Sequence, residues 1–167
     1  MKEIIDKISS YDLFNNLLPG VIFVLFLREI TDYNLIQENL LIGVGLYYFI
    51  GLVISRFGSL VIEETLKHKK IKFLKKADYK DYILACDIDY KIDLFSEVNN
   101  MYRNLLSAFC LLVLSKIHQL VSTYFEIPND ISLVILLASL IILFAFSYRK
   151  QTQVIVERVK IRNKKEK

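Results

Sequence analysis

The sequence has few of the residues that build metal sites or disulfide frameworks. Among its 167 residues there are two cysteines and two histidines. Cys86 lies in a charged stretch and Cys110 in an apolar one, so a disulfide between them would draw a charged loop into apolar surroundings. Reduced thiols, which are typical of a cytoplasmic face, are the simpler interpretation. No His-rich metal spacing is present, and no metal site is expected.

Sequence signatures of catalysis are also missing. There is no glycine-rich phosphate loop and no nucleophile elbow, so we expect no enzymatic activity, no catalytic residue and no cofactor. Asp87, Asp89 and Asp93 are spaced like metal ligands, but their segment lacks the glycine and the terminal glutamate of a calcium loop, which favours solvated turn residues. No acidic residue lies within a long apolar run, which argues against an ion-coupled transporter or pump.

What the sequence does have is charged and apolar residues in separate blocks. Apolar residues make up 54% of the chain and charged residues 24%. A bilayer selects such segregation because charge is costly in hydrocarbon. Four apolar runs are candidate transmembrane helices, at residues 13–27, 40–62, 105–121 and 131–148. The first is the weakest, because it is short and contains Asn15, Asn16 and a Pro19–Gly20 pair.

The basic residues set the expected orientation. Residues 63–104 and 149–167 are rich in Lys and Arg, whereas the other two connections between runs carry only Arg28, at one border. Basic loops stay in the cytoplasm. We therefore predict an all-α polytopic membrane protein with both termini inside. Its expected parts are spans one and two (1–62), a cytoplasmic helical connection (63–104), spans three and four (105–148) and a basic cytoplasmic tail (149–167).

The cytoplasmic connection carries helical signals. We expect a short helix over residues 79–86, a turn over 87–89, and then one long helix that continues into span three, because no helix breaker interrupts its apolar period. Spans two and three would thus extend into a helical hairpin. The period defines a partly buried apolar stripe of Ile92, Phe95, Val98, Tyr102, Leu105 and Phe109. Its partner could be the 79–86 helix, the tail, another copy or a separate protein.

Three groups of residues are candidate packing or binding sites. Small residues on span two allow close helix approach, within the bundle or between copies: Gly51, Ser55, Gly58 and Ser59. Polar residues near the inner interface could form a structural clamp, or a ligand or partner site: Arg56, Glu63, Glu97, Asn100 and Arg103. A basic run suits anionic lipid or a partner protein, and no specific nucleic acid binding is expected: Lys69, Lys70, Lys72, Lys75 and Lys76.

Four segments resemble a group of small, uncharacterised bacterial four-span membrane proteins: YDLFNNLLPG (11–20), GLVISRFGSLVI (51–62), SEVNNMYR (96–103) and FSYRKQT (146–152). That group has no established activity or site to transfer. In size and architecture the chain is also similar, in outline only, to the small four-span membrane components of bacterial anti-phage systems. These resemblances imply the bacterial inner membrane as the location.

Two functions from different classes follow as expectations. The first is a non-enzymatic bacterial inner-membrane protein that forms a homo-oligomer and couples its cytoplasmic helical surface to a soluble protein partner in antiviral defence. The alternative is a small channel or transporter with a polar path lined by Asn15, Asn16, Ser55, Arg56, Ser107 and Ser115. His118, close to Lys116, is expected to make a local hydrogen bond rather than to relay protons.

Overall fold

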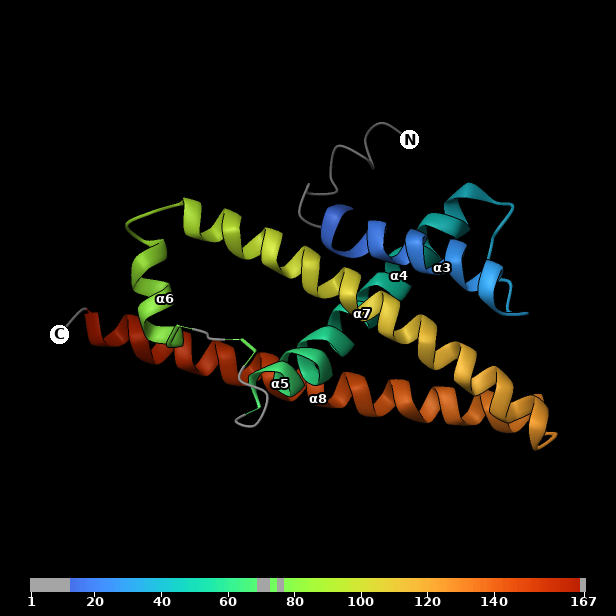
Figure 1. Cartoon of the computed structure of the whole chain (residues 1–167). Coiled ribbons are helices and arrows are strands. Elements are labelled where there is room, and N and C mark those ends of the chain that lie inside the picture. Colours follow the sequence, from blue (N-terminus) through green and yellow to red (C-terminus); the bar gives the residue numbers. More distant parts are fainter. Residues whose placement is uncertain (1–12, 69–72, 75–76, 166–167) are drawn as a thin grey trace.

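The structure is a computed structural model that describes residues 13–68, 73–74 and 77–165, and these residues contain helices and no strand. The elements in chain order are the π-helical turn η1 (Leu13–Leu17), α3 (Leu18–Ile30), α4 (Leu40–Phe57), the π-helical turn η2 (Gly58–Ile62), α5 (Glu63–Lys67), α6 (Tyr79–Cys86), α7 (Lys91–Tyr124) and α8 (Asn129–Lys165). Figure 1 shows α7 and α8 joined at one end, with α6 at the other end.

Among the described residues, three helices are long and apolar enough to cross a membrane: Leu40–Lys67, Lys91–Tyr124 and Asn129–Asn163. Little of their apolar surface is covered by the protein itself, and in the last only 6% of the apolar stretch is buried. So much exposed apolar surface is consistent with hydrocarbon as the solvent. Helix α3, with 13 residues, is about 20 Å long, which is shorter than a bilayer core. The fourth span therefore stays a prediction.

The core lies where α3 packs against α4 and α7. Val24 of α3, Ile54 of α4 and Ala108 of α7 are almost completely buried there. Pro19 stands at the start of α3, where its missing N–H and fixed φ are tolerated. A Cβ on the next residue, Gly20, would overlap the carbonyl oxygen of Tyr47. The Pro19–Gly20 pair therefore lies in the first turn of α3, and Gly20 allows the close approach of α3 to α4.

Both helices expected in and beyond the central connection are confirmed. Helix α6 covers Tyr79–Cys86, and the Asp78 side chain caps it by accepting a hydrogen bond from the Lys80 N–H. Helix α7 is continuous over 34 residues, from Lys91 to Tyr124, which is about 51 Å. It therefore extends well beyond the apolar run that begins at residue 105.

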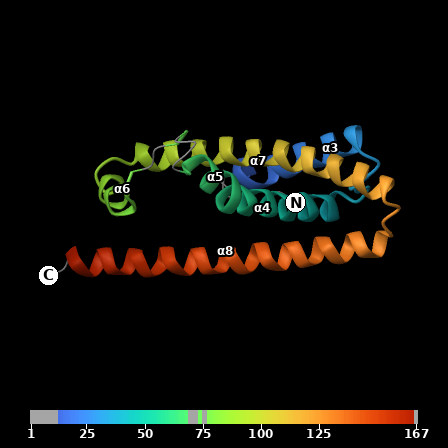
Figure 2. The same ribbon diagram turned by 60° about the horizontal axis from the view of Figure 1, so that its bottom comes forward.

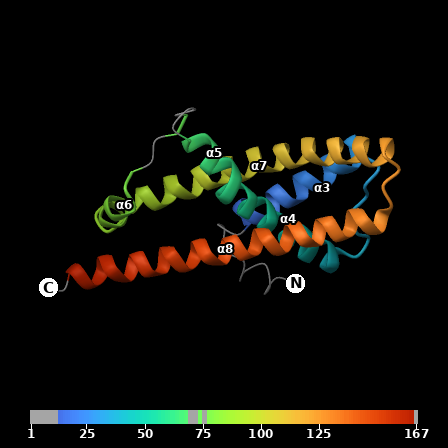
Figure 3. The same ribbon diagram turned by 90° about the horizontal axis from the view of Figure 1, so that it is seen from below.

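Helix α8 forms a layer of its own. Figure 2 shows it apart from α3, α4 and α7, and its main described neighbour is α4, which crosses it at an angle (Figure 3). Beyond the apolar runs, α6, the first part of α7 and the last part of α8 lie at the same end of the molecule (Figure 1). We call residues 79–103 and 149–163 the charged layer.

Candidate functional site

A buried ion-pair network joins α5 to α7 where the apolar runs end. Glu63 is only 5% exposed. Arg103 Nη1 lies 3.1 Å from Glu63 Oε2, and Lys67 Nζ lies 2.5 Å from Glu63 Oε1. Lys67 is also 3.4 Å from Glu64. Two cations thus neutralise one buried carboxylate, which makes this group an ionic clamp between helices.

The π-helical turn η2 comes directly before the clamp. The Glu63 N–H donates to the carbonyl of Gly58, five residues earlier, which is the π-helical pattern. An i→i+5 turn rotates the residues that follow it relative to an α-helix. The face that α5 presents to α7 therefore depends on η2. Such single π-helical turns occur frequently at functional sites.

A second buried polar contact fastens η1 to α7. Asn104 is 1% exposed, and its Nδ2 donates to the carbonyl of Asn15 at 2.6 Å. Ser107 is fully buried and its Oγ donates to the carbonyl of Arg103 at 2.6 Å. Asn15 Oδ1 and Arg103 Nε are buried without a hydrogen-bond partner in the described part of the chain. Asn15 and Ser107, both candidates for a polar path, thus take part in contacts within the bundle.

The small residues of span two face three different neighbours. A Cβ on Gly51 would overlap the backbone of Asn16 in η1, and one on Gly58 would overlap the Ser107 hydroxyl of α7. Ser59 accepts hydrogen bonds from Lys150 Nζ of α8, at its carbonyl (2.7 Å) and at its hydroxyl (2.9 Å). Ser55 is half-buried. At three of these four positions, the small residue allows contact with a helix of the same chain.

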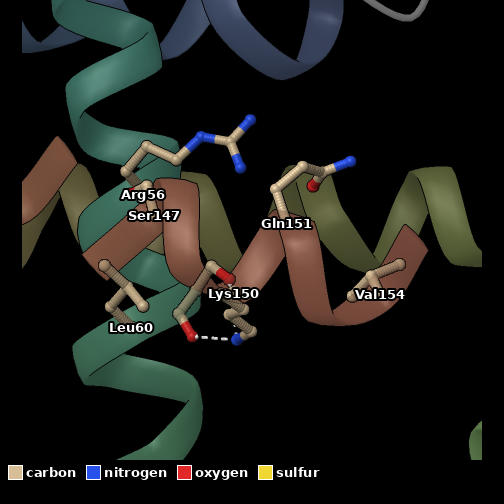
Figure 4. Close-up of a pocket in the computed structure, with 7 residues that line it drawn as sticks. Arg56, Leu60, Ser147, Lys150, Gln151 and Val154 are labelled. Carbon is tan, nitrogen blue, oxygen red and sulfur yellow. Dashed lines mark hydrogen bonds between the residues drawn. The ribbon is translucent and has the colours of Figure 1, made fainter. Parts of the chain in front are cut away.

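A small pocket lies where α8 crosses the end of α4 and η2 (Figure 4). Its volume is about 150 Å³, and it is lined by Arg56, Ser59, Leu60, Ser147, Lys150, Gln151 and Val154. Lys150 is engaged by Ser59 and lies 3.6 Å from Glu64. Arg56 is half-buried and has neither a hydrogen bond nor an ion pair with the described residues. The pocket is therefore cationic.

The structure does not bring all the expected polar residues together. Glu63 and Arg103 pair directly, whereas Glu97 and Asn100 are half-buried on α7 and make no hydrogen bond or ion pair within the described ranges. Lys67 is not among the residues predicted for this cluster, although its spacing of four from Glu63 is typical of a helical ion pair. The candidate lipid or partner residues lie outside the described residues: Lys69, Lys70, Lys72, Lys75 and Lys76.

Two side-chain contacts hold the charged layer together. Arg162 of α8 donates two hydrogen bonds to the carboxylate of Asp87, at 2.9 and 3.2 Å, which ties the end of α8 to the turn after α6. Tyr82 OH of α6 donates to Asp93 Oδ1 of α7 at 3.1 Å. Burial, assisted by the hydrogen bond to Asp93, raises the pKa of Tyr82 to about 12.

The charged layer leaves many large apolar side chains exposed. Phe95 is 67% exposed and Tyr102 is 64% exposed. Of the expected stripe, only Ile92 and Leu105 are half-buried, and the contact of α6 with α7 leaves Phe95, Val98 and Tyr102 exposed. The exposed apolar residues of the layer are Ile88, Tyr90, Leu94, Phe95, Val98, Tyr102, Ile155, Val156 and Val159. We call this set the apolar surface of the charged layer.

The opposite end of α7 holds a second, smaller polar group. Tyr33 OH and His118 Nδ1 lie 3.0 Å apart, so the expected local hydrogen bond of His118 is confirmed. Gln119 accepts from Lys116 Nζ at 3.1 Å and donates to Asp32. These contacts fix the segment after α3 against the end of α7.

Comparison with known proteins finds no matching family model, no matching curated sequence and no matching solved structure. The class of protein is therefore described from the sequence and structure of this chain alone. In the part that the structure describes, the protein is all-helical, and three of its helices are long and apolar enough to cross a membrane. An ionic clamp joins its helices at one end, and the charged layer extends them there.

Proposed function

We propose that this chain is a non-enzymatic bacterial inner-membrane protein that oligomerises and couples its charged layer to a soluble partner in antiviral defence. We include in this proposal four spans, with α3 as the first, and a cytoplasmic position for the charged layer and both termini. The apolar surface of the charged layer is the observation that supports it most directly.

That surface lies beyond the length that a bilayer covers. Residues 91–104 of α7 and 149–163 of α8 each add roughly 20 Å of helix to an apolar run, at 1.5 Å per residue. Phe95, which is ten positions or about 15 Å before the apolar run that begins at residue 105, is therefore expected to face water rather than hydrocarbon. Large apolar side chains that gather on a water-facing part of a protein are typical of protein–protein contact sites, where aromatic residues contribute strongly.

The contacts of α3 support a fourth span. At one end, Asn15 of η1 accepts a hydrogen bond from Asn104, and past the other end Tyr33 bonds to His118. These two partners are 14 positions apart on α7, or about 21 Å. The segment from η1 to Tyr33 therefore accompanies most of the apolar run 105–121. We therefore expect this segment to lie in the same solvent as the apolar run of α7, which supports a membrane span.

The defence role rests on the outline similarity of the chain to small anti-phage membrane components, and on a membrane scaffold that presents an interaction surface and no recognised catalytic motif. The rival function, a channel or transporter, has less support, because Asn15 and Ser107 are buried and take part in contacts within the bundle. Ion flux through purified protein in liposomes would separate the two functions. We expect the liposomes to stay tight.

The experiment that tests coupling to a soluble partner compares substitutions at the two ends of α7. We compare wild type with Phe95→Ala and Tyr102→Ala. The matched control is Tyr124→Ala, at a tyrosine that is also exposed (81%) but lies at the other end of α7. Proteins crosslinked in intact membranes would be identified by mass spectrometry, together with the crosslinked oligomer. A soluble partner should be lost with the first two variants and kept with the third. Equal recovery from all four proteins would contradict coupling through this surface.

A further inference from the structure

We infer that the pocket between η2 and α8 binds a phosphate group, with the guanidinium of Arg56 as its main ligand. This site is separate from the apolar surface of the charged layer and does not depend on a partner protein. The phosphate could come from a phospholipid headgroup or from free phosphate in solution. The lining of the pocket favours the phospholipid.

The first step is the missing counter-charge of Arg56. The two carboxylates closest in sequence are occupied elsewhere: Glu63 by Arg103 and Lys67, and Glu64 by Lys67 and Lys150. The residues that line the pocket include two cations and no acid. A half-buried arginine without a counter-ion at the end of a membrane helix is costly, so an anion in the pocket would stabilise it.

The second step is the direction of the side chains. Figure 4 shows Arg56 and Gln151 extending to the same side of α8, whereas Lys150 turns to the other side, toward its hydrogen bonds with Ser59. The Arg56 guanidinium and the Gln151 amide thus present N–H donors to one region. A planar guanidinium binds phosphate oxygens in a bidentate manner, and the amide can add a third hydrogen bond.

The third step is size and depth. The pocket volume of about 150 Å³ is enough for a molecule such as benzene, and hence for a phosphate group. Ser147 lies in the last turn of the apolar run 131–148, so the pocket lies at the level where headgroups meet hydrocarbon. Leu60 and Val154 give it apolar walls, which suit the glycerol and acyl part of a lipid. Basic pockets between membrane helices commonly hold phospholipid headgroups.

Native mass spectrometry of the purified full chain in detergent tests this site. The probes are phosphatidylglycerol, diacylglycerol, which has the same acyl part without phosphate, and inorganic phosphate. The variants are Arg56→Gln and Arg56→Lys, with Arg149→Gln as the control, because Arg149 is an exposed cation on α8 that does not line the pocket. Size-exclusion profiles and thermal melting show whether each variant is folded.

We expect wild type and Arg149→Gln to retain phosphatidylglycerol and not diacylglycerol. Arg56→Gln should weaken this binding by about tenfold, because a charge-assisted hydrogen-bond pair is lost. Arg56→Lys should keep the charge and fall between the two, since lysine cannot bind in a bidentate manner. Equal loss in Arg56→Gln and Arg149→Gln would overturn the inference, and so would equal retention of diacylglycerol. Arg56-dependent binding of inorganic phosphate, without a preference for the lipid, would support the site and identify free phosphate as its ligand.

Discussion

Arg103 on α7 donates a hydrogen bond of 3.1 Å to the buried carboxylate of Glu63 on α5, forty positions earlier in the sequence. Lys67 approaches the second oxygen of the same carboxylate at 2.5 Å. The carboxylate is thus shared by one cation from its own helix and one from a neighbour. Removing its charge would leave Arg103 without its counter-ion, and Lys67 with only Glu64 at 3.4 Å, in a poorly solvated place.

Glu63→Gln should therefore destabilise the protein by about 3 kcal/mol, in the range for breaking a buried ion pair on one side only. The measurement is unfolding of the purified protein by increasing SDS in mixed micelles, followed by circular dichroism. Glu97→Gln is the matched control, because Glu97 is half-buried on α7 and has no ion pair among the described residues. Its effect should be within about 0.5 kcal/mol. Equal effects of both variants would mean that the clamp contributes no stability.

Gly51→Ala should destabilise the bundle by about 1–3 kcal/mol, because the added Cβ would overlap the backbone of Asn16, which cannot move without displacing η1. The same unfolding titration measures it. Gly45→Ala on the same helix is the control, since nothing lies within 4 Å of a Cβ at that position. There, alanine should stabilise the helix by about 0.5–1 kcal/mol. If both variants behaved alike, close packing of α4 on η1 would be refuted.

Much of the helical framework could be predicted from the sequence, because its signals are local. Asp78 provides a cap before α6, and the uninterrupted apolar period after Ile92 predicts the continuity of α7. The exposure of Phe95 and Tyr102 could not be predicted in the same way. Periodicity defines one face of a helix, but it does not say whether a second helix covers that face.

The clamp could be predicted only in part, for a geometric reason. Depth along a span can be read from the sequence, and it predicts Arg103, Asn100 and Glu97 at the same level as Glu63. The structure shows α4 crossing α7 rather than running beside it (Figure 1), so contact is confined to a short length of α7. Asn100 and Glu97 lie roughly 4.5 and 9 Å further along the axis than Arg103, at 1.5 Å per residue, and miss this contact. The crossing angle and the π-helical turn η2 leave no clear sequence signal.

Tyr82 gives a prediction for alkaline pH. Its folded pKa of about 12 is higher than that of an unfolded tyrosine, roughly 10. The neutral phenol therefore adds stability that is fully present below about pH 10 and is lost as the pH rises toward 12. Tyrosinate absorbance of the folded protein should contain a late ionisation step that Tyr82→Phe removes. Tyr90→Phe, which changes an exposed tyrosine in the connection between α6 and α7, should leave that step in place. An unchanged titration of Tyr82→Phe would contradict the assignment.

The expected membrane orientation can be tested with single cysteines in a chain whose Cys86 and Cys110 are replaced by serine. Lysine and arginine are held on the cytoplasmic side, so an impermeant maleimide added to intact spheroplasts should label Asn34→Cys and Asn129→Cys. Both positions are exposed, Asn34 in the connection after α3 and Asn129 at the first residue of α8. Lys160→Cys, in the charged layer, should react only after the membrane is permeabilised.

To determine the number of spans, a cysteine must be labelled at one more position, because α3 by itself is shorter than a bilayer core. Lys2→Cys and Asn34→Cys lie on either side of η1 and α3 in the sequence. If this segment crosses at the depth of the apolar run of α7, as its contacts with Asn104 and His118 suggest, the two cysteines must differ in accessibility. Labelling of both from outside would mean three spans and an external N-terminus. That outcome would contradict the contacts of the segment with Asn104 and His118, which are about 21 Å apart along α7 and place Asn15 at the inner end of its apolar run.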